Sequence, residues 1–381
     1  MRPYTLIAGD FVSTGGMDRA NLALASYLAR QGYPLRLVAH RVAEELLSFP
    51  NVRFIHVPKP ANAYMLGEPL LDAVGRLWAL RTRAEGGQVL ANGGNCAVPA
   101  ANWVHYVHGA YVSEGTGSVL RRIKGRVSHR LYLRGERKAL RKARVIIANS
   151  ERTKADLVSA TGASPERVHV VYYGIDPERF RPRGVEERRE ARAALGWPQE
   201  RRVALFVGAL GDKRKGFDTV FPAWARLCER ADWNVDLKVV GVGAQRETWE
   251  REAQARGLGE RIQFLGFRKD VPVLMGAADL LIAPTRYEAY GLGVHEALST
   301  GLPALVSRTA GVAERYPGEL RELLIDDPND VGELVRRLEV WRAREAELSP
   351  HVARLAETLR SQTWDGMSAA IVELLERERT R

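Results

Sequence analysis

The stretch 284–303 constrains this chain more than any other part of the sequence. The short apolar run 280–283 ends at a proline, and a polar loop with two glycines follows it. A helix-like segment then runs from about 291 to 300 and stops at Gly301. The pattern predicts a buried strand, a loop and a helix N-terminus in direct succession.

Two carboxylates in this stretch are spaced to hold a long ligand. Glu288 lies in the loop and Glu296 lies inside the helix, so at roughly 1.5 Å of rise per helical residue they should stand on the order of 10 Å apart. The backbone N–H groups near Tyr290, Gly291 and Leu292 lie between them, where a helix start favours a phosphate. A nucleotide-sugar, with a diphosphate between two hydroxyl-bearing sugars, has the matching shape. The alternative is that both acids are ordinary solvated carboxylates beside a structural turn.

This stretch resembles the Glu-x7-Glu signature of the retaining glycosyltransferases of family 4. The segments Glu288-Ala-Tyr-Gly-Leu, Glu296-Ala and Gly301-Leu-Pro303 follow the order and spacing of that signature. The resemblance implies the GT-B fold, in which two Rossmann-like domains face a central cleft. It also implies that Glu296 holds the ribose hydroxyls of the donor, and that Glu288 contacts the transferred sugar.

The rest of the chain alternates short buried strands with helices, which predicts α/β architecture with parallel sheets covered on both faces. The expected strands are 4–8, 35–39, 53–57, 88–91, 103–107, 145–149 and 168–172, then 203–207, 236–240, 262–265, 280–283 and 304–306.

Glycine and proline punctuation at 173–182 marks a connection between two doubly wound domains. We therefore expect an acceptor-binding domain at 1–175, a donor-binding domain at 176–360 and a C-terminal helix at 361–381 that returns to the first domain, as the GT-B fold implies. The charged residues 186–192 predict a solvated helix after the connection.

A basic loop follows the first strand of the second half. Arg214 and Lys215 lie there, after Gly208 at the strand end. Departure of a nucleoside diphosphate creates negative charge, and an Arg–Lys pair stabilises it without a metal. The family has a basic pair at this position, so the resemblance assigns these residues to the diphosphate and Gly208 to the donor site. A solvated basic loop is the alternative.

Other loops that follow strands match the family more weakly. Gly16 belongs to a Gly-Gly turn where bare backbone approaches the donor, and His108 follows strand 103–107 as the family's histidine near the anomeric carbon. Phe267 and Arg268 stand where the family meets the nucleotide base. His105 and His108 would point to opposite faces of a strand, which does not favour a metal site.

The segment 121–144 holds eleven Lys or Arg residues and a single acid, Glu136. Apolar residues near helical spacing make it a basic amphipathic helix, which predicts contact with an anionic membrane or with the acceptor. A solvated helix packed on the first domain is the alternative. The basic residues that we assign to this surface are Arg121, Arg122, Lys124, Arg126, Arg130 and Arg134.

Composition limits the remaining possibilities. With 381 residues, 45% apolar and 27% charged, the chain is long enough for two globular domains. Its N-terminal apolar run is too short for a signal peptide, and no run is long enough to span a bilayer, so we expect a cytoplasmic protein that can rest on the membrane. Two cysteines form no framework, and the Asp-x-Asp metal signature of the other main glycosyltransferase fold is absent from the sequence. We expect no metal and no cofactor.

The favoured function is a retaining transfer of sugar from a nucleoside-diphosphate sugar to an acceptor glycan or glycolipid. A sugar-nucleotide 2-epimerase shares the fold and would need no acceptor. A glycosidase would use Glu288 and Glu296 as its carboxylate pair, about 5–10 Å apart, but the phosphate-binding loop does not favour it. The net charge of +11 also suggests a nucleic-acid binder, although the sequence shows no binding module of that kind.

Overall fold

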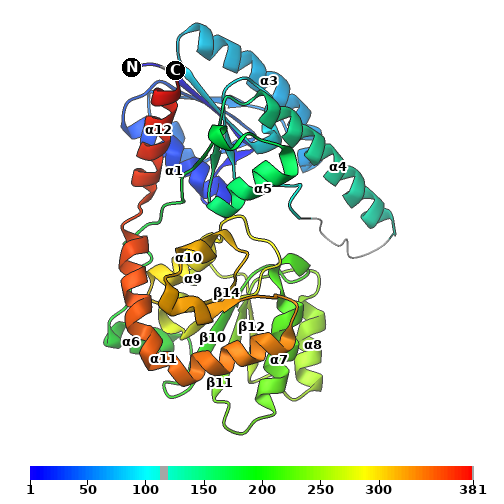
Figure 1. Cartoon of the computed structure of the whole chain (residues 1–381), viewed down its shortest axis with the longest axis vertical. Coiled ribbons are helices and arrows are strands. Elements are labelled where there is room, and N and C mark those ends of the chain that lie inside the picture. Colours follow the sequence, from blue (N-terminus) through cyan, green and yellow to red (C-terminus); the bar gives the residue numbers. More distant parts are fainter. Residues whose placement is uncertain (112–118, 380–381) are drawn as a thin grey trace. The chain divides into compact units, whose positions relative to one another are not determined.

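The computed structural model of the chain describes residues 1–111 and 119–379, and for residues 119–124, 126 and 379 it describes the backbone alone. The chain divides into two compact units. Unit 1 comprises residues 1–174 and 362–381, and unit 2 comprises residues 175–361. Helices cover the sheet of each unit on both faces (Figure 1). The fold is GT-B, with two Rossmann-like domains, as predicted.

Unit 1 is built on a seven-stranded parallel sheet of order β5-β3-β1-β6-β7-β8-β9, with a two-stranded parallel pair β2-β4 beside it. Its elements are β1 (Tyr4–Ile7), β2 (Asp10–Phe11), α1 (Gly16–Arg30), β3 (Leu35–Ala39), β4 (Arg41–Val42), α2 (Glu44–Leu47), β5 (Val52–His56), η1 (Pro60–Asn62), α3 (Tyr64–Ala84), β6 (Gln88–Asn92), η2 (Gly93–Asn95), β7 (Ala101–Val104), α4 (Val119–Lys142), β8 (Val145–Ala148), α5 (Glu151–Thr161), η3 (Pro165–Arg167), β9 (Val168–Val170) and α12 (Trp364–Arg379).

Unit 2 is built on a six-stranded parallel sheet of order β12-β11-β10-β13-β14-β15. Its elements are α6 (Val185–Ala194), β10 (Arg202–Val207), η4 (Lys213–Lys215), α7 (Phe217–Cys228), β11 (Val235–Val240), α8 (Arg246–Ala255), β12 (Ile262–Gly266), α9 (Val271–Ala277), β13 (Leu280–Ala283), α10 (Leu292–Ser299), β14 (Ala304–Ser307), η5 (Gly311–Arg315), η6 (Gly318–Leu323), β15 (Leu324–Ile325) and α11 (Val331–Arg360).

The central strands are short apolar runs because they are buried from both sides. β8 reads Val-Ile-Ile-Ala and β13 reads Leu-Leu-Ile-Ala, without the polar alternation of a half-exposed strand. The core of unit 2 is filled by large side chains such as Phe206, Trp224 and Trp341. This burial holds the ends of neighbouring strands in register, so the loops after them start from fixed points.

The last helix belongs to unit 1, in agreement with the predicted return to the first domain. On α12, Asp365 pairs with Arg30 of α1 at 2.5 Å, and Glu376 accepts a hydrogen bond from the Tyr4 hydroxyl at 2.8 Å. The rings of Tyr173 and Trp364 lie 6.2 Å apart. The segments at 173–174 and 363–364, through which the chain leaves and re-enters unit 1, therefore lie side by side.

One strand prediction was wrong in a way that matters for the site. β7 spans Ala101–Val104 and not 103–107, because residues 101–104 pair with Val145–Ala148 and the chain then leaves the sheet. A turn follows, in which the Ala110 N–H donates to the Val107 carbonyl. His105 and His108 therefore lie in the segment after the strand, and the rule for opposite strand faces does not apply to them.

Candidate active site

The order of strands in unit 2 points to one place on its sheet. The chain runs outward from β10 to β11 and β12, then returns to place β13, β14 and β15 on the other side of β10. The order thus reverses between β10 and β13, and ligands of open α/β sheets bind outside the carboxyl ends of the strands at such a reversal. Residues 208–216 follow β10 and residues 284–291 follow β13, so the two predicted motifs lie at this point.

Glycines allow these two loops to approach each other. Gly216 has φ of +76°, and a Cβ there would lie 2.1 Å from the Pro284 carbonyl oxygen. Gly208 lies against the aliphatic part of Lys215, where a Cβ would be 3.3 Å from Lys215 Cγ. Asp212 caps the short η4 turn by accepting from the Arg214 N–H at 3.0 Å. The backbone therefore fixes where Arg214 and Lys215 start.

The structure brings together the catalytic residues predicted in unit 2. Lys215 Nζ lies 2.8 Å from Glu288 Oε2, and Arg214 Nη1 lies 3.4 Å from the same oxygen. The side chain of Glu288 is 22% exposed. Burial favours its neutral form, but Lys215 and Arg214 outweigh that effect and hold the pKa of Glu288 below its ordinary value. At neutral pH the cluster is an ion-paired carboxylate between two cations.

Arg286 is part of this arrangement, and sequence reasoning missed it. Its guanidinium contacts Asp218 of α7 at 2.8 Å and donates to Asn329 Oδ1 at 2.6 Å, and its backbone N–H donates to the Arg214 carbonyl at 2.8 Å. It also donates to the Lys213 carbonyl. Arg286 thus joins the loop after β13 to the loop after β10. Its place two residues before Glu288 was the available signal.

Helix α10 starts where the sequence predicts. Gly291 is its N-cap with φ of +106°, and a Cβ there would lie 2.9 Å from Val312. The Tyr290 carbonyl accepts from the Val312 N–H at 2.6 Å. The Tyr290 hydroxyl lies 2.6 Å from His295 Nδ1 in a buried pair, so a role of Tyr290 toward a ligand is left to its backbone. Leu292 is the first helical residue and is buried.

Glu296 lies in the second turn of α10 and is buried. The neighbouring His295 is buried as well, and its burial lowers its pKa to about 4, so this histidine is neutral at physiological pH. The ribose role of Glu296 stays a prediction, since it rests on the family resemblance.

The two residues predicted to meet the base follow β12, the edge strand of the sheet. Phe267 is 67% exposed, which is unusual for a phenylalanine and leaves its ring open to a ligand. Arg268 forms a two-pronged ion pair with Asp270, at 2.8 and 2.5 Å. An interaction of Arg268 with a base would have to share the guanidinium with Asp270.

In unit 1 the predicted residues lie at the carboxyl ends of the central strands. Gly16 begins α1 after β1, and Gly15 before it has φ of +83°. His108 follows β7 and contacts Glu136 of α4. His105 is buried between Asn92, at 3.1 Å, and the Tyr173 hydroxyl, at 2.5 Å, and burial lowers its pKa to about 3. Within residues 1–111 and 119–379, no group of three His, Cys, Asp or Glu side chains is arranged to hold a metal ion.

A polar cluster near Gly16 was not predicted. Asp10 is buried after β1 and takes two hydrogen bonds from Arg41, at 3.1 and 2.7 Å, and one from the Tyr64 hydroxyl at 2.5 Å. Lys59 Nζ lies 3.9 Å from the Tyr64 ring centre. Burial and the nearby Asp10 raise the pKa of Asp18, in the first turn of α1, to about 6. These groups add charge and hydrogen-bonding capacity to the same sheet edge.

The predicted basic segment forms α4, and the structure covers its second half in full. Arg130 and Arg134 are exposed on this helix. The side chains of Arg121, Arg122, Lys124 and Arg126 lie outside the described part of the chain. In the described residues, no helix has both the length and the apolar character needed to cross a membrane.

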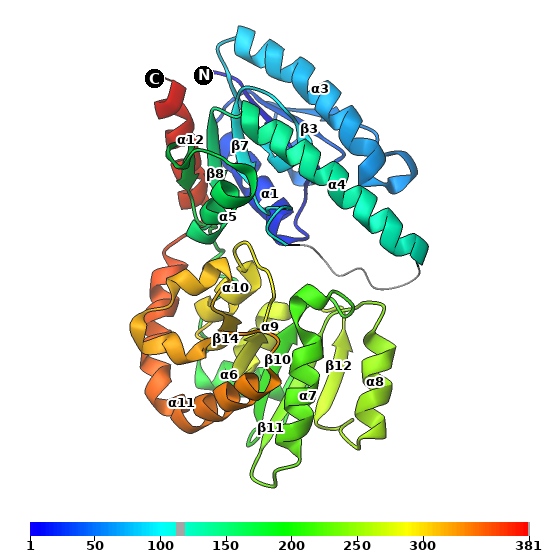
Figure 2. The same ribbon diagram turned by 45° about the vertical axis from the view of Figure 1, so that its right-hand side comes forward.

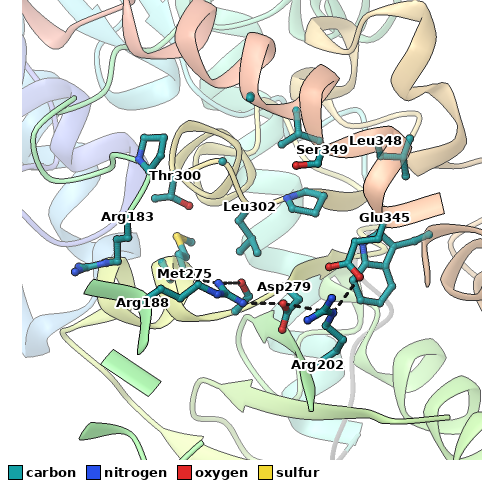
Figure 3. Close-up of a pocket in the computed structure, with 18 of the residues that line it drawn as sticks. Arg183, Arg188, Arg202, Met275, Asp279, Thr300, Leu302, Glu345, Leu348 and Ser349 are labelled. Carbon is teal, nitrogen blue, oxygen red and sulfur yellow. Dashed lines mark hydrogen bonds and ion pairs between the residues drawn. The ribbon is translucent and has the colours of Figure 1, made fainter. Parts of the chain in front are cut away.

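A cavity of about 530 Å³ in unit 2 lies at the other edge of the sheet, at the amino ends of the strands. Figure 3 shows Asp279, just before β13, between Arg188 of α6 and Arg202 of β10, with Glu345 beyond Arg202. Asp279 accepts from Arg188 at 2.7 Å and from the buried Arg192 at 2.5 Å. Asp279 and Glu345 are thus held in ion pairs, and the predicted site residues do not line this cavity.

Comparison with known proteins gives a consistent family. The family model described as Glycosyltransferase Family 4 matches residues 14–179, and the model described as Glycosyl transferases group 1 matches residues 187–358. The 2-deoxystreptamine glucosyltransferase of Streptomyces kanamyceticus is 32% identical over 214 residues, which are 55% of this chain and 54% of that protein. The chain thus spans about half the length of the curated relatives it matches.

Solved structures share the fold over almost the whole chain. WaaG, a glycosyltransferase involved in lipopolysaccharide biosynthesis, superposes with a TM-score of 0.74 at 22% identity and covers 98% of this chain and 99% of its own. HepE from Anabaena, solved with UDP and glucose, gives a TM-score of 0.72 at 18% identity. The superposition covers 99% of this chain and 100% of HepE. With its two halves matched by the two family models, the chain belongs to glycosyltransferase family 4.

Proposed function

We propose that the protein transfers a sugar from a nucleoside-diphosphate sugar to an acceptor hydroxyl with retention of anomeric configuration. The observation that carries the proposal is the cluster of Glu288, Lys215 and Arg214 at the reversal of strand order in unit 2. Two cations held at this point suit a diphosphate, and a carboxylate beside them suits the hydroxyls of the attached sugar.

In the proposed reaction, Arg214, Lys215 and the N-terminus of α10 stabilise the diphosphate as it departs. Glu296 holds the ribose hydroxyls, and Phe267 and Arg268 contact the base. Gly16 and Gly208 give the donor close access to backbone. Arg214 and Lys215 neutralise the negative charge of the departing diphosphate, as a metal ion does in other enzymes. The proposed reaction therefore uses no metal and no cofactor.

The retaining step is proposed to need no covalent intermediate. Glu288 is neutralised by Lys215 and Arg214, which makes its carboxylate a poor nucleophile. The bond from the anomeric carbon to the β-phosphate oxygen breaks, and the acceptor oxygen bonds to the same face of that carbon. The proton of the acceptor hydroxyl passes to an oxygen of the departing phosphate.

A thermal-shift screen against nucleoside diphosphates tests donor binding. A ligand at 100 times its dissociation constant adds about 2.7 kcal/mol of stability. UDP is the first candidate, because HepE was solved with UDP and glucose. A screen in which no nucleoside diphosphate stabilises the protein would contradict the proposal.

Product analysis with UDP-glucose separates transfer from epimerisation. Consumption that depends on an added acceptor supports transfer, whereas conversion of the donor alone indicates a 2-epimerase. Protection of the protein by arbitrary DNA at low salt would instead support nucleic-acid binding.

For the acceptor side we propose contact with an anionic membrane on its cytoplasmic face, where a glycolipid or envelope glycan would be reached. Six large apolar side chains on α3 and α4 are 40–66% exposed: Leu66, Leu70, Leu77, Leu80, Val127 and Leu131. The two helices lie side by side (Figures 1 and 2), and Lys138 of α4 lies 3.9 Å from Asp72 of α3. Arg130 and Arg134 border the apolar residues, so the surface combines insertion with charge attraction.

Sedimentation with vesicles of phosphatidylcholine and an anionic lipid tests this surface. Wild type should bind them at low salt, and the triple change of Leu70, Leu77 and Leu80 to Ser should abolish binding. Leu47→Ser, at an exposed leucine of α2, is the matched control and should bind as wild type does. If the triple variant binds as strongly as wild type, α3 is not the docking surface.

A further inference from the structure

The only acid of the basic segment 121–144 lies against a residue of the candidate site. Glu136 of α4 is 1% exposed, and its Oε1 accepts a hydrogen bond from the His108 backbone N–H at 3.0 Å. The same oxygen lies 3.1 Å from Nδ1 of the His108 ring. One carboxylate oxygen therefore holds both the backbone and the side chain of His108.

This contact fixes the tautomer of His108. A carboxylate accepts hydrogen bonds and has no proton to give, so the proton between the two groups must be on Nδ1 of the ring. In the neutral imidazole the other nitrogen, Nε2, then carries a lone pair. In that form, His108 is a hydrogen-bond acceptor toward a ligand.

Neighbouring aromatic rings hold the imidazole in place. Tyr132 of α4 stacks on it with centroids 5.3 Å apart and an interplanar angle of 27°, and Tyr106 meets it edge-on at 5.2 Å. The side chain of His108 remains 34% exposed. The ring is thus oriented from three sides and still open to solvent.

Burial of Glu136 is energetically unfavourable, which indicates a role beyond stability. In the described part of the chain, Glu136 Oε2 is buried and has no hydrogen-bond partner, which is unfavourable for a carboxylate. α4 approaches η2 so closely that a Cβ on Gly94 would lie 3.1 Å from the Glu136 backbone nitrogen. A buried acid contributing only to stability would be expected to have both oxygens bonded.

We infer that Glu136 is a positioning residue, which holds His108 as the Nδ1–H tautomer so that Nε2 accepts a hydrogen bond from a hydroxyl of a sugar bound at the carboxyl ends of the unit 1 strands. The inference rests on the proposed function for the identity of the ligand. It rests on the contacts above for the state of the ring. A sugar in which fluorine or hydrogen replaces that hydroxyl has no proton to donate to Nε2.

Glu136→Leu separates this role from simple packing. Leucine fills a similar volume but has no atom that accepts a hydrogen bond, so it releases Nδ1 and lets the ring take the Nε2–H form, in which Nε2 is a donor. Glu136→Gln is the comparison, because its side-chain oxygen can take the place of Oε1 and still accept from both the His108 N–H and Nδ1. The hydrogen bond from a sugar hydroxyl to Nε2 would be lost or reversed in Glu136→Leu.

The ring can be observed directly by ¹⁵N NMR of the histidines, with His108→Ala used to assign its signals. Wild type and Glu136→Gln should show the Nδ1–H tautomer, and Glu136→Leu should shift toward Nε2–H. Glu68→Gln is the matched control, because Glu68 of α3 lies near His108 without a hydrogen bond to it in the described chain. It should leave the tautomer unchanged.

Kinetics complete the test. Glu136→Leu should lower kcat by about tenfold to a hundredfold with unchanged affinity for nucleoside diphosphate. Combined with His108→Ala, it should cost nothing further. A wild-type ring in the Nε2–H form, a ring unaffected by Glu136→Leu, or additive losses in the double variant would each overturn the inference. A wild type that transfers no sugar would contradict the proposed function, and the NMR result would still decide the role of Glu136.

Discussion

Replacing Glu288 by Gln should tighten the binding of nucleoside diphosphate while it reduces sugar transfer. Glu288 Oε2 forms ion pairs with Lys215 at 2.8 Å and with Arg214 at 3.4 Å. The carboxylate therefore contacts the same two cations that are proposed to bind the diphosphate. A phosphate that binds Lys215 must do so beside this negative charge. Glutamine keeps the shape of the side chain and removes the repulsion.

The size of the effect follows from the geometry of the ammonium group. Two acceptors at 2.8 Å on one tetrahedral nitrogen lie about 4.6 Å apart. Two unit charges at that distance repel by about 3.6 kcal/mol at an effective dielectric constant of about 20. Because the Glu288 side chain is 22% exposed, water and salt reduce this to about 1–2 kcal/mol. The affinity for nucleoside diphosphate should therefore rise roughly 5- to 30-fold.

Isothermal titration calorimetry with UDP at several salt concentrations measures the change, and the gain should shrink as salt rises. Glu319→Gln is the control, because Glu319 is exposed in unit 2 and its replacement changes net charge equally. Transfer from UDP-glucose should fall more than tenfold in Glu288→Gln, since the contact with the sugar is lost. Equal or weaker UDP binding by Glu288→Gln than by wild type would refute the assignment of these cations to the diphosphate.

Three further predictions test the structure of unit 2. Asp279→Ala should lower the free energy of unfolding by about 3–5 kcal/mol in urea titrations, because Arg192 would stay buried without its carboxylate. Asp232→Ala, at an exposed acid, should leave the free energy of unfolding nearly unchanged. Gly216→Ala should cost at least about 2 kcal/mol and weaken UDP binding, because its φ is +76° and its Cβ would meet the Pro284 carbonyl, whereas Gly125→Ala has open space and should not destabilise. The pKa of Glu288 is lower in the folded protein than its ordinary value of about 4.5, so its ionised form stabilises the fold above about pH 4.5. This stabilisation is lost as the pH falls through the folded-state pKa. The free energy of unfolding, measured from pH 7 to pH 3, should therefore fall more in wild type than in Glu288→Gln.

The sequence predicted that Lys215 and Glu288 both belong to the donor site, although 73 positions separate them, but it did not predict their ion pair. Glycine and proline mark where β10 and β13 end, and parallel strands place their carboxyl ends at one edge of the sheet. The family resemblance supplied the register of the two loops. Fold class followed from the same alternation of apolar runs and helices.

Contacts made by side chains from distant elements could not be predicted in this way. Glu136 stood out in the sequence only as the single acid among eleven cations, and His108 lies 28 positions away from it. Arg192 belongs to a segment whose charge pattern predicts a solvated helix, yet it is 2% exposed because Asp279, 87 positions on, accepts from it. A charge pattern along one helix does not show which of its members meets a partner inside the fold.

The ion pairs at the two ends of the strands in unit 2 differ in burial, and this contrast favours the candidate site at the carboxyl ends. At the amino ends of the strands, Asp279 is bonded by Arg192, Arg188 and the Val203 N–H, an arrangement complete without a ligand. At the carboxyl ends, backbone turns at glycines bring two cations onto one partly exposed carboxylate. An anion that bound Arg192 or Arg188 at the amino ends would have to displace Asp279 from this buried network, at a cost of several kcal/mol. At the carboxyl ends, an anion would share Lys215 and Arg214 with Glu288. The backbone turns already hold these two cations in place, so binding the anion requires no rearrangement of the loops.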